Sequence, residues 1–494
     1  MEYRIFPAIG IARLGNSPEF FVGPEVPGSL GRDLGPGGET EVTAFADAAN
    51  RKRKQASRFH LYQRTTATDP FVPLVLPSGA KVRWTVHVVN KKDAIKRPAS
   101  PPPSIPVGGL RPTADAARAS RLIDSGNVQI EGVNALGKFL DGTHDGDSVR
   151  LGELRTDSQG RLLVLGADGI SKSKPVSSIG VSFYNNPNWH DDVADGPVNA
   201  EVVLSDGTSQ KAMGAWVIVG PPDFAPGAYA IVTLYDEIFQ VAVSQGWLPN
   251  PTSTSFTTDI FPLIRRASSL RWSHGRKNLT DTVVSEPNWN AISNDYMQLA
   301  KSDGGHLTLR AQNSTRIKAV KGLLSDYLLT AAQNAHLSRW ENGTFLEDWT
   351  GLPPVPASPT PESLTRSALD GTVGQGFFPG IEGGRILIDR SIYSTPFDFR
   401  IDPMKLTPGD VTALMAQPWQ ADFLKCSGNW WPSQRPDIAP QSDGSLKMWA
   451  LVGNPPHVPD HQALVDHVMQ FGMVVPKVVG GVEVCIEEGR DPAV

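Results

Sequence analysis

The chemically most unusual stretch of the chain is residues 418–437, PWQADFLKCSGNWWPSQRPD. Pro418 suits the first turn of a short helix, because its missing N–H is not needed there. Asp422 and Cys426 are four residues apart, so on such a helix they would share one face, with Cβ atoms about 5–6 Å apart. The sequence Ser-Gly-Asn that follows predicts a turn that ends the helix. A carboxylate and a thiol are therefore expected side by side.

Two consecutive tryptophans, Trp430 and Trp431, come directly after this turn. Four residues of extended chain span at most about 14 Å, so an indole has to stay close to Cys426. A carboxylate, a thiol and an indole are thus forced into one small volume. The residues alone also fit an ordinary core cluster in which Asp422 merely caps a turn, because Cys and Trp are both often buried.

The composition and the apolar pattern of the whole chain predict the fold that must position this stretch. It is a β-rich α+β fold, large and irregular, with many short strands and a few helices. The 494 residues include 47 glycines and 42 prolines, a content that favours turns and loops. Alternation of apolar and polar residues and short apolar runs predict strands at residues 3–14, 80–92, 148–166, 177–184, 199–205, 212–220, 385–389, 397–401, 474–479 and 482–486. Apolar residues spaced by three or four predict helices at residues 228–245, 316–340, 408–426 and 459–471.

A proline-rich segment at 353–361, PPVPASPTP, predicts a linker. It divides the chain into a β-rich N-terminal region, 1–352, and a C-terminal region, 362–494, that carries the cysteine and the tryptophans. The longest helix, near 316–340, belongs to the first region.

The charge balance and the apolar pattern argue against several classes of protein. Lys and Arg number 46 against 51 Asp and Glu, a net charge of −5, which argues against a partner bound through nucleic-acid phosphates. No apolar stretch reaches the roughly 18 residues of a membrane span, and the N-terminus lacks the pattern of a signal peptide. We therefore expect a cytoplasmic protein, with non-classical export as the alternative. Its two cysteines fit a reducing compartment or a chemical use.

Several blocks along the chain resemble one family, the quinoprotein amino-acid oxidases of the lysine ε-oxidase and glycine oxidase group. The blocks are Phe6–Ser17, Phe21–Glu25, Asn188–Val198, Trp216–Pro226, Leu234–Asp236, Asp422, Cys426 and Trp430–Pro432. Since they run from residue 6 to residue 432, the resemblance covers most of the chain.

The resemblance implies a cofactor made from the protein itself, cysteine tryptophylquinone. A tryptophan becomes an ortho-quinone and its ring is bonded to a cysteine sulfur; here these residues would be Cys426 and either Trp430 or Trp431. Asp422 matches the carboxylate that the family needs for maturation of the cofactor. This sequence departs from the family in two respects. Characterised members are longer, and they place a large insertion between the cysteine and the tryptophan, where only three residues stand here.

An ortho-quinone offers an electrophilic carbonyl to a primary amine and then accepts an electron pair. The resemblance therefore implies oxidative deamination of a primary amine or amino acid, with O2 as oxidant and H2O2 and ammonia as products. Asp422, in an apolar pocket, would have a raised pKa and is the candidate base. Tyr235 and His190 are weaker candidates for contact with the substrate; Tyr235 also fits a core position, and His190 a hydrogen-bonded turn.

The resemblance further implies a flavoprotein partner that installs the quinone and a homo-oligomer. Two other classes remain open. The first is a protein that keeps the family fold with a missing or altered cofactor and acts as a scaffold or binding protein.

The second alternative is a metal site, formed by His457, Asp460, His461, His467, Glu487 and Glu488. Two histidines four residues apart can ligate a metal from one helical face. Pro459 lies between His457 and His461 and argues against a continuous helix there, so we expect no metal site. A nucleotide site is not indicated either, because the Gly-rich stretch at 35–38 lacks the strand–GxGxxG–helix context.

Overall fold

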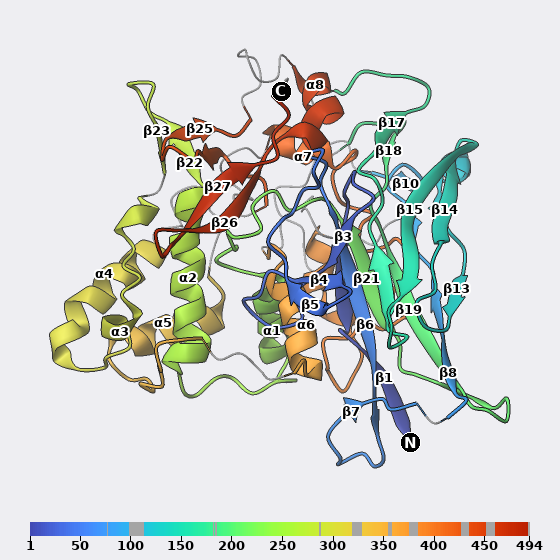
Figure 1. The fold of residues 1–494 in the computed structure, drawn as a ribbon, viewed down its shortest axis with the longest axis horizontal. Coiled ribbons are helices and arrows are strands. Elements are labelled where there is room, and N and C mark those ends of the chain that lie inside the picture. Colours follow the sequence, from blue (N-terminus) through green and yellow to red (C-terminus); the bar gives the residue numbers. More distant parts are fainter. Residues whose placement is uncertain are drawn as a thin grey trace.

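The computed structural model describes the chain except residues 77, 98–112, 181, 183–184, 286–287, 319–328, 354–357, 375–383, 426–433, 451–459 and 493–494. Among the described residues, seventeen strands join in one mixed sheet, beside which the helices lie (Figure 1). These strands are β1 (Glu2–Phe6), β2 (Ile9–Arg13), β3 (Phe20–Val22), β4 (Arg32–Gly35), β5 (Gly38–Glu41), β6 (Lys54–Arg64), β7 (Val72–Pro73), β8 (Lys81–Val86), β9 (Val89–Asn90), β12 (Ile123–Asp124), β13 (Val128–Glu131), β14 (Lys138–His144), β15 (Asp147–Thr156), β16 (Leu162–Leu165), β19 (Ala194–Val203), β20 (Ser209–Lys211) and β21 (Ala215–Gly220).

Two-stranded sheets and helices complete the fold. The paired strands are β10 (Ile95–Lys96) with β11 (Thr113–Ala114), β17 (Ser171–Ser173) with β18 (Trp189–Asp191), β22 (Gly275–Lys277) with β23 (Val283–Ser285), β24 (Ile438–Pro440) with β25 (Leu446–Met448), and β26 (Met473–Val479) with β27 (Val482–Glu488). The α-helices are α1 (Leu234–Ser244), α2 (Phe261–Ser269), α3 (Tyr296–Leu299), α4 (Leu307–Lys318), α5 (Ala331–Glu341), α6 (Pro361–Asp370), α7 (Gln420–Lys425) and α8 (His461–His467).

Two parallel neighbours, β2 and β21, form the part of the sheet that is covered on both faces. Side chains alternate between the two faces of a strand, and here each face meets a different core. Ile9, Ile11 and Trp216 pack against α1 and α6, whereas Ala12 and Val217 face the main core of the sheet. Burial on both faces explains why these strands read as nearly continuous apolar runs.

Strand β19 brings together the parts of the chain that matter for the site. It pairs antiparallel with β8 and with β21, and its residue Asp195 lies opposite Val89 of β9. The chain just after β9 therefore lies next to the turn between β18 and β19. These two stretches supply the buried polar residues described below.

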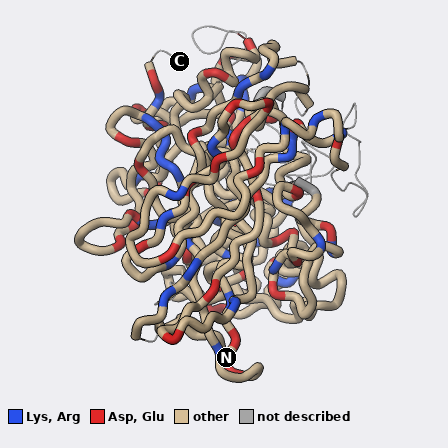
Figure 2. The backbone as a smooth tube through the Cα atoms, turned by 90° about the vertical axis from the view of Figure 1, so that its right-hand side faces the viewer, with Lys and Arg blue, Asp and Glu red and all other residues tan. Residues whose placement is uncertain are grey.

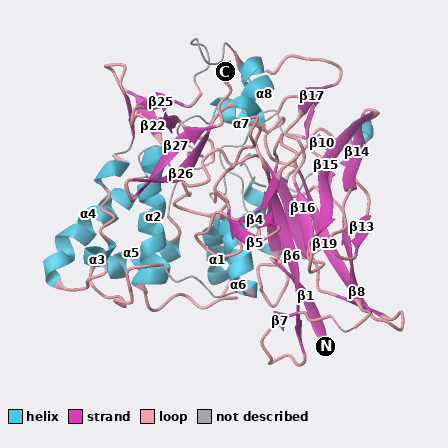
Figure 3. Cartoon of the chain, in the orientation of Figure 1, coloured by secondary structure: helices cyan, strands magenta, loops and turns pink. Residues whose placement is uncertain are grey.

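The C-terminal region packs directly on the sheet, with α7 and α8 at the top of the view in Figure 3. Trp419, Phe423, Trp449 and Phe471 belong to the same apolar core as sheet residues such as Phe59. The helices α2 to α5 gather on the opposite side of the molecule from β13–β15 (Figure 3), around a second apolar core.

The predicted α+β class is confirmed, and so are several predicted elements. Helix α1 ends at Ser244, near the predicted end, although it begins only at Leu234, where Thr233 forms a capping box. Helix α8 lies inside the predicted range 459–471, and β26 and β27 match the predicted strands 474–479 and 482–486 to within two residues at each end. The division of the chain at 353–361 stays a prediction.

The predicted continuous helix at 316–340 is wrong. Thr330 has extended backbone angles and its side chain accepts the N–H of Gln333, which starts α5 at Ala331. This reciprocal cap interrupts a helix that the apolar stripe alone would continue. Residues 319–328 of the predicted helix lie outside the described residues.

Four further predictions in irregular parts of the chain are wrong. Of the helix predicted at 408–426, the described residues form only α7, preceded by turns. The segment 385–389 is a 3₁₀-helix rather than a strand, and 397–401 contributes only the single bridge between Tyr393 and Ile401. The described residues of 177–184 form no strand.

Surface features add little to the functional assignment. Figure 2 shows basic and acidic residues interspersed over the side of the molecule that it presents. Among the described residues, no helix has the length and apolar character needed to cross a membrane.

The close approach at Gly196 gives a test of the fold. A Cβ at Gly196 would lie 1.8 Å from the carbonyl oxygen of His87, so the strands would have to move apart. We expect Gly196→Ala to lower the free energy of unfolding by about 1–3 kcal/mol. Gly37→Ala is the matched control, because a Cβ there meets no atom within 4 Å. Denaturant unfolding of both variants measures this, and equal midpoints would contradict the strand packing.

Candidate active site

Helix α7 carries the first member of the predicted reactive group. Asp422 lies on this helix with only 2% of its surface exposed. Trp419 and Phe423 are also buried, and their rings meet edge to face with centroids 5.3 Å apart. Ala421 packs in a small apolar cluster with Trp189. The carboxylate of Asp422 is thus held on a short helix whose neighbours are largely apolar.

The other members of the predicted group, Cys426, Trp430 and Trp431, lie outside the described residues. The described residues that precede and follow this stretch contact each other. Nε of Arg435 donates to the carbonyl oxygen of Phe423 at 3.0 Å, a contact between residues twelve apart. The described residues on either side of this stretch, Phe423 and Arg435, are therefore neighbours, and the grouping of Cys426 with a tryptophan stays a prediction.

The segment before α7, residues 409–419, has no regular secondary structure, and side chains from the first half of the chain bind its backbone. The carboxylate of Asp195 is fully buried. It accepts the N–H groups of Val411 at 3.2 Å and Thr412 at 2.7 Å. The indole N–H of Trp216 donates to the same carboxylate at 3.0 Å. Asp195 therefore fixes the start of the segment against the sheet.

A buried ion pair between Lys92 and Asp191 holds the middle and end of this segment. Lys92 is 1% exposed and Asp191 is fully buried, and their charged groups are in direct contact. Nζ of Lys92 also donates to the carbonyl oxygen of Ala416 at 2.7 Å. Oδ2 of Asp191 accepts the N–H of Trp419 at 2.7 Å, one residue before α7 begins. Burial lowers the pKa of Lys92 to about 8, while Asp191 opposes this shift, so the lysine stays protonated at neutral pH.

Gln417 forms the third attachment. Its side-chain Nε2 donates to Oδ1 of Asp93 at 2.9 Å and to the carbonyl oxygen of Trp189 at 2.7 Å. Burial opposes ionisation of Asp93, but hydrogen bonds with His144 and Gln417 and the charge of Arg121 hold its pKa below the usual value. The carboxylate is therefore charged and keeps the Gln417 side chain in place.

Sequence reasoning did not name Lys92, Asp93 or Asp195 as site residues. One signal was present in the sequence, since Lys92 ends the strand predicted at 80–92 and Asp93 follows it directly. Such charged residues look like an ordinary solvated loop until the partner strand is known.

The structure places the two weaker candidates apart from α7. His190 lies between Trp189 and Asp191 on β18, and these two neighbours contact the 417–421 stretch. Because successive side chains of a strand point to opposite faces, His190 turns away, and its ring lies 4.3 Å from that of His144. Burial and the neighbouring His144 lower the pKa of His190 to about 4, so it is neutral at pH 7.

Tyr235 lies on α1 and belongs to a different apolar core from α7. Its ring stacks on that of Phe399 with centroids 5.0 Å apart, and Arg366 lies over it. Burial raises the pKa of Tyr235 to about 12. A role for Tyr235 or His190 in contact with substrate stays a prediction.

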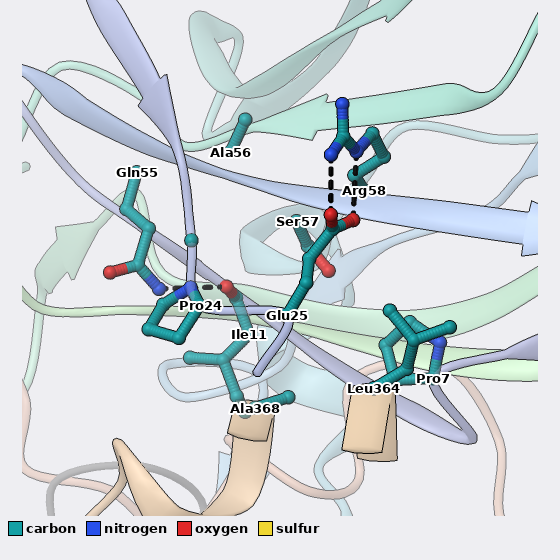
Figure 4. Close-up of a pocket in the computed structure, with 11 residues that line it drawn as sticks. Pro7, Ile11, Pro24, Glu25, Gln55, Ala56, Ser57, Arg58, Leu364 and Ala368 are labelled. Carbon is teal, nitrogen blue, oxygen red and sulfur yellow. Dashed lines mark hydrogen bonds and ion pairs between the residues drawn. The ribbon is translucent and has the colours of Figure 1, made fainter. Parts of the chain in front are cut away.

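A pocket elsewhere in the molecule is lined by a carboxylate and a guanidinium group that form an ion pair with each other. Figure 4 shows Glu25 and Arg58 facing each other beside α6 residues Leu364 and Ala368. Nε of Arg58 donates to Glu25 at 2.7 Å. Burial opposes ionisation of Glu25, yet Arg58 and His60 hold its pKa far below the usual value. The cavity volume is about 20 Å³, room for about one water molecule, so we regard this cluster as structural.

The described residues offer no set of ligands that supports the metal alternative. Among the residues that the structure describes, no group of three or more His, Cys, Asp or Glu side chains is arranged to hold an ion. His467 pairs through Nδ1 with Gln470 at 2.8 Å, and His457 lies outside the described residues.

Two family models match the chain and cover more than half of it between them. The model described as "L-Lysine epsilon oxidase N-terminal" matches residues 6–219, and that described as "L-lysine epsilon oxidase C-terminal domain" matches residues 311–449. The chain therefore belongs to the L-lysine ε-oxidase family, as the sequence blocks predict. The 409–419 segment lies in the second matched region, and the side chains that hold it lie in the first.

Relatives agree with this assignment. The L-lysine 6-oxidase of Marinomonas mediterranea is 28% identical over 535 aligned positions, which cover 86% of this chain and 71% of that protein. The crystal structure of the L-Lys ε-oxidase from Marinomonas mediterranea has a similar fold, with a TM-score of 0.75 at 21% identity over 99% of this chain and 94% of that one. A structure of the Schiff base intermediate of that oxidase with L-Lys gives a TM-score of 0.74 at 21% identity, covering 99% and 95% of the two chains.

Asp192, next to the buried ion pair, gives a pH-dependent test of the site. Its Oδ2 accepts the N–H groups of Gly169 at 2.7 Å and Ile170 at 3.0 Å. Oδ1 is buried without a hydrogen-bond partner among the described residues. Burial raises the pKa of Asp192 from 3.8 to about 7. Between these values the folded protein keeps a proton that the unfolded chain releases, so the contribution of this group to stability falls as pH rises from about 4 to about 7.

We therefore expect Asp192→Asn, which mimics the protonated acid, to gain stability relative to the parent protein as pH rises through this range. Thermal unfolding of both proteins at several pH values measures the difference. A difference that stays constant, or that shrinks with rising pH, would contradict the raised pKa.

Proposed function

We propose that the protein is an amine oxidase acting on an amino acid or another primary amine. The overall reaction converts R–CH₂–NH₂, O₂ and water into R–CHO, ammonia and hydrogen peroxide. The observation that carries the proposal is the position of Asp422, buried on the helix that leads directly to Cys426, in a chain that belongs to the L-lysine ε-oxidase family.

The residues present fit a cysteine tryptophylquinone formed by Cys426 and one of Trp430 and Trp431. Cys426, Trp430 and Trp431 lie in sequence between Phe423 and Arg435, which contact each other, and a buried carboxylate stands four residues before the cysteine. Once formed, such a group supplies an electrophilic carbonyl and accepts two electrons.

The other functions fall to side chains of α7. Trp419 and Phe423 present apolar surface beside Asp422 and limit the access of water. A carboxylate oxygen of Asp422 can then receive a proton from the carbon that bears the amino group, because general bases act best when held within hydrogen-bond reach of that proton. The same carboxylate is the candidate for a role in maturation of the cofactor.

The relatives support the proposed substrate class. The Marinomonas mediterranea enzyme is named for oxidation of L-lysine, and we propose an amino acid as the substrate here as well. Maturation in this proposal requires a flavoprotein partner, and the mature protein is a homo-oligomer.

The test begins with the intact mass of protein produced together with the flavoprotein of its native host. The quinone replaces two ring hydrogens by two oxygens, and the thioether removes one ring hydrogen and the thiol hydrogen. We expect this mass change, a quinone absorbance, and release of peroxide with at least one amino acid. Cys426→Ala should abolish the crosslink and the peroxide, and Asp422→Asn should slow formation of the crosslink at least about tenfold, a loss of transition-state stabilisation of about 1.4 kcal/mol or more.

Cys485→Ala is the control, since Cys485 is the other cysteine of the chain and lies on β27, where it is buried at 3% exposure. It should keep the quinone. An unmodified mass for the parent protein would contradict the proposal and favour a protein that keeps the family fold as a scaffold.

A further inference from the structure

Lys92 and Asp191 do more than occupy space in the core, because both bind the backbone of the segment that precedes α7. We propose that they are positioning residues for cofactor formation, because their ion pair fixes the chain that enters α7 and so fixes the position of Asp422, four residues before Cys426. The inference rests on the proposed function and deepens it.

The ion pair forms hydrogen bonds with three further residues, Ala416, Trp419 and Asn90. One ammonium group contacts both the carboxylate of Asp191 and the carbonyl oxygen of Ala416, at 2.7 Å for the latter. The carboxylate in turn accepts the N–H of Trp419 at 2.7 Å, and Asn90 donates to it at 2.9 Å. Two backbone groups three residues apart are thereby fixed by two side chains that are themselves buried and hydrogen-bonded.

A buried ion pair contributes little net stability to a core, because both charges lose their hydration. Apolar side chains of the same volume often stabilise the core equally well. The ion pair instead fixes the orientation of the backbone that it binds, since each hydrogen bond holds a particular atom in a particular direction. The ion pair acts on residues 416 and 419, and α7 begins at Gln420. A shift at Trp419 is therefore passed directly to Asp422.

Cofactor formation is sensitive to such a shift. Thioether formation breaks the S–H bond of Cys426 and one indole C–H bond, and it makes one S–C bond. It releases two protons and two electrons, which pass to the flavin of the maturation partner and then to O₂. Bond formation requires near-contact of the two atoms in the right orientation, and a misplacement of about 1 Å can slow such a step about a hundredfold.

The chain offers a closely matched control. Lys52 is also 1% exposed, and burial lowers its pKa to about 8 as well. Its Nζ donates to the carbonyl oxygens of Asn50 at 3.1 Å and Gly489 at 2.8 Å, not to the 409–419 segment. Loss of this lysine reproduces the general cost of removing a buried ammonium.

The experiment compares Lys92→Met with Lys52→Met, both produced with the flavoprotein partner. The readout is the crosslinked fraction of soluble, folded protein by intact mass, with circular dichroism as the check on folding. We expect the crosslinked fraction to fall at least about tenfold in Lys92→Met and to stay within about twofold of the parent protein in Lys52→Met. Asp191→Asn, which keeps an acceptor for Trp419, should fall less than Lys92→Met and carries the test if Lys92→Met does not fold.

Each outcome decides the inference. Full crosslinking in folded Lys92→Met or Asp191→Asn would overturn it, and so would equal losses in the Lys92 and Lys52 variants. If the parent protein itself carries no crosslink, it is the proposed function that fails.

Discussion

The buried contact between Lys92 and Asp191 is the interaction on which the candidate site depends. It joins the chain after β9, the strand β18 and the backbone of residues 416–419, although 99 residues separate the two partners and 324 separate Lys92 from Ala416. Removing one member of such a pair costs about 3–5 kcal/mol because the other charge is left buried. The pair is therefore costly to disturb, which keeps the entry to α7 in one position.

This constraint explains how an irregular segment can serve as a rigid support. Buried backbone groups need partners, and helices and sheets normally provide them. Residues 409–419 receive many of them instead from side chains, among them those of Asp195, Lys92, Asp191 and Arg97. The two regions matched by the family models are thus parts of one site: the first supplies the support, and the second supplies Asp422 and the residues of the proposed cofactor.

The short helix and the family could be predicted from the sequence, and the long-range support of the site could not. The short helix with Asp422 follows from local spacing, and the residue blocks led to the family. The helix prediction at 316–340 failed because a capping box at Thr330 outweighs an apolar stripe, and that at 408–426 failed because long-range bonds to Asp195 and Lys92 hold the backbone in turns. No sequence pattern pairs Lys92 with Asp191, since only the pairing of β9 with β19 brings them together.

Native-state hydrogen exchange of the 409–419 segment tests the central claim most directly. If side chains hold this segment as firmly as a sheet would, the amides of Val411, Thr412 and Trp419 exchange as slowly as those of β19, although they lie in no strand and precede the helix. Exchange as fast as that of the exposed turn at 35–38 would contradict the account, because a backbone that opens so readily could not keep α7 and the proposed reactive group in register.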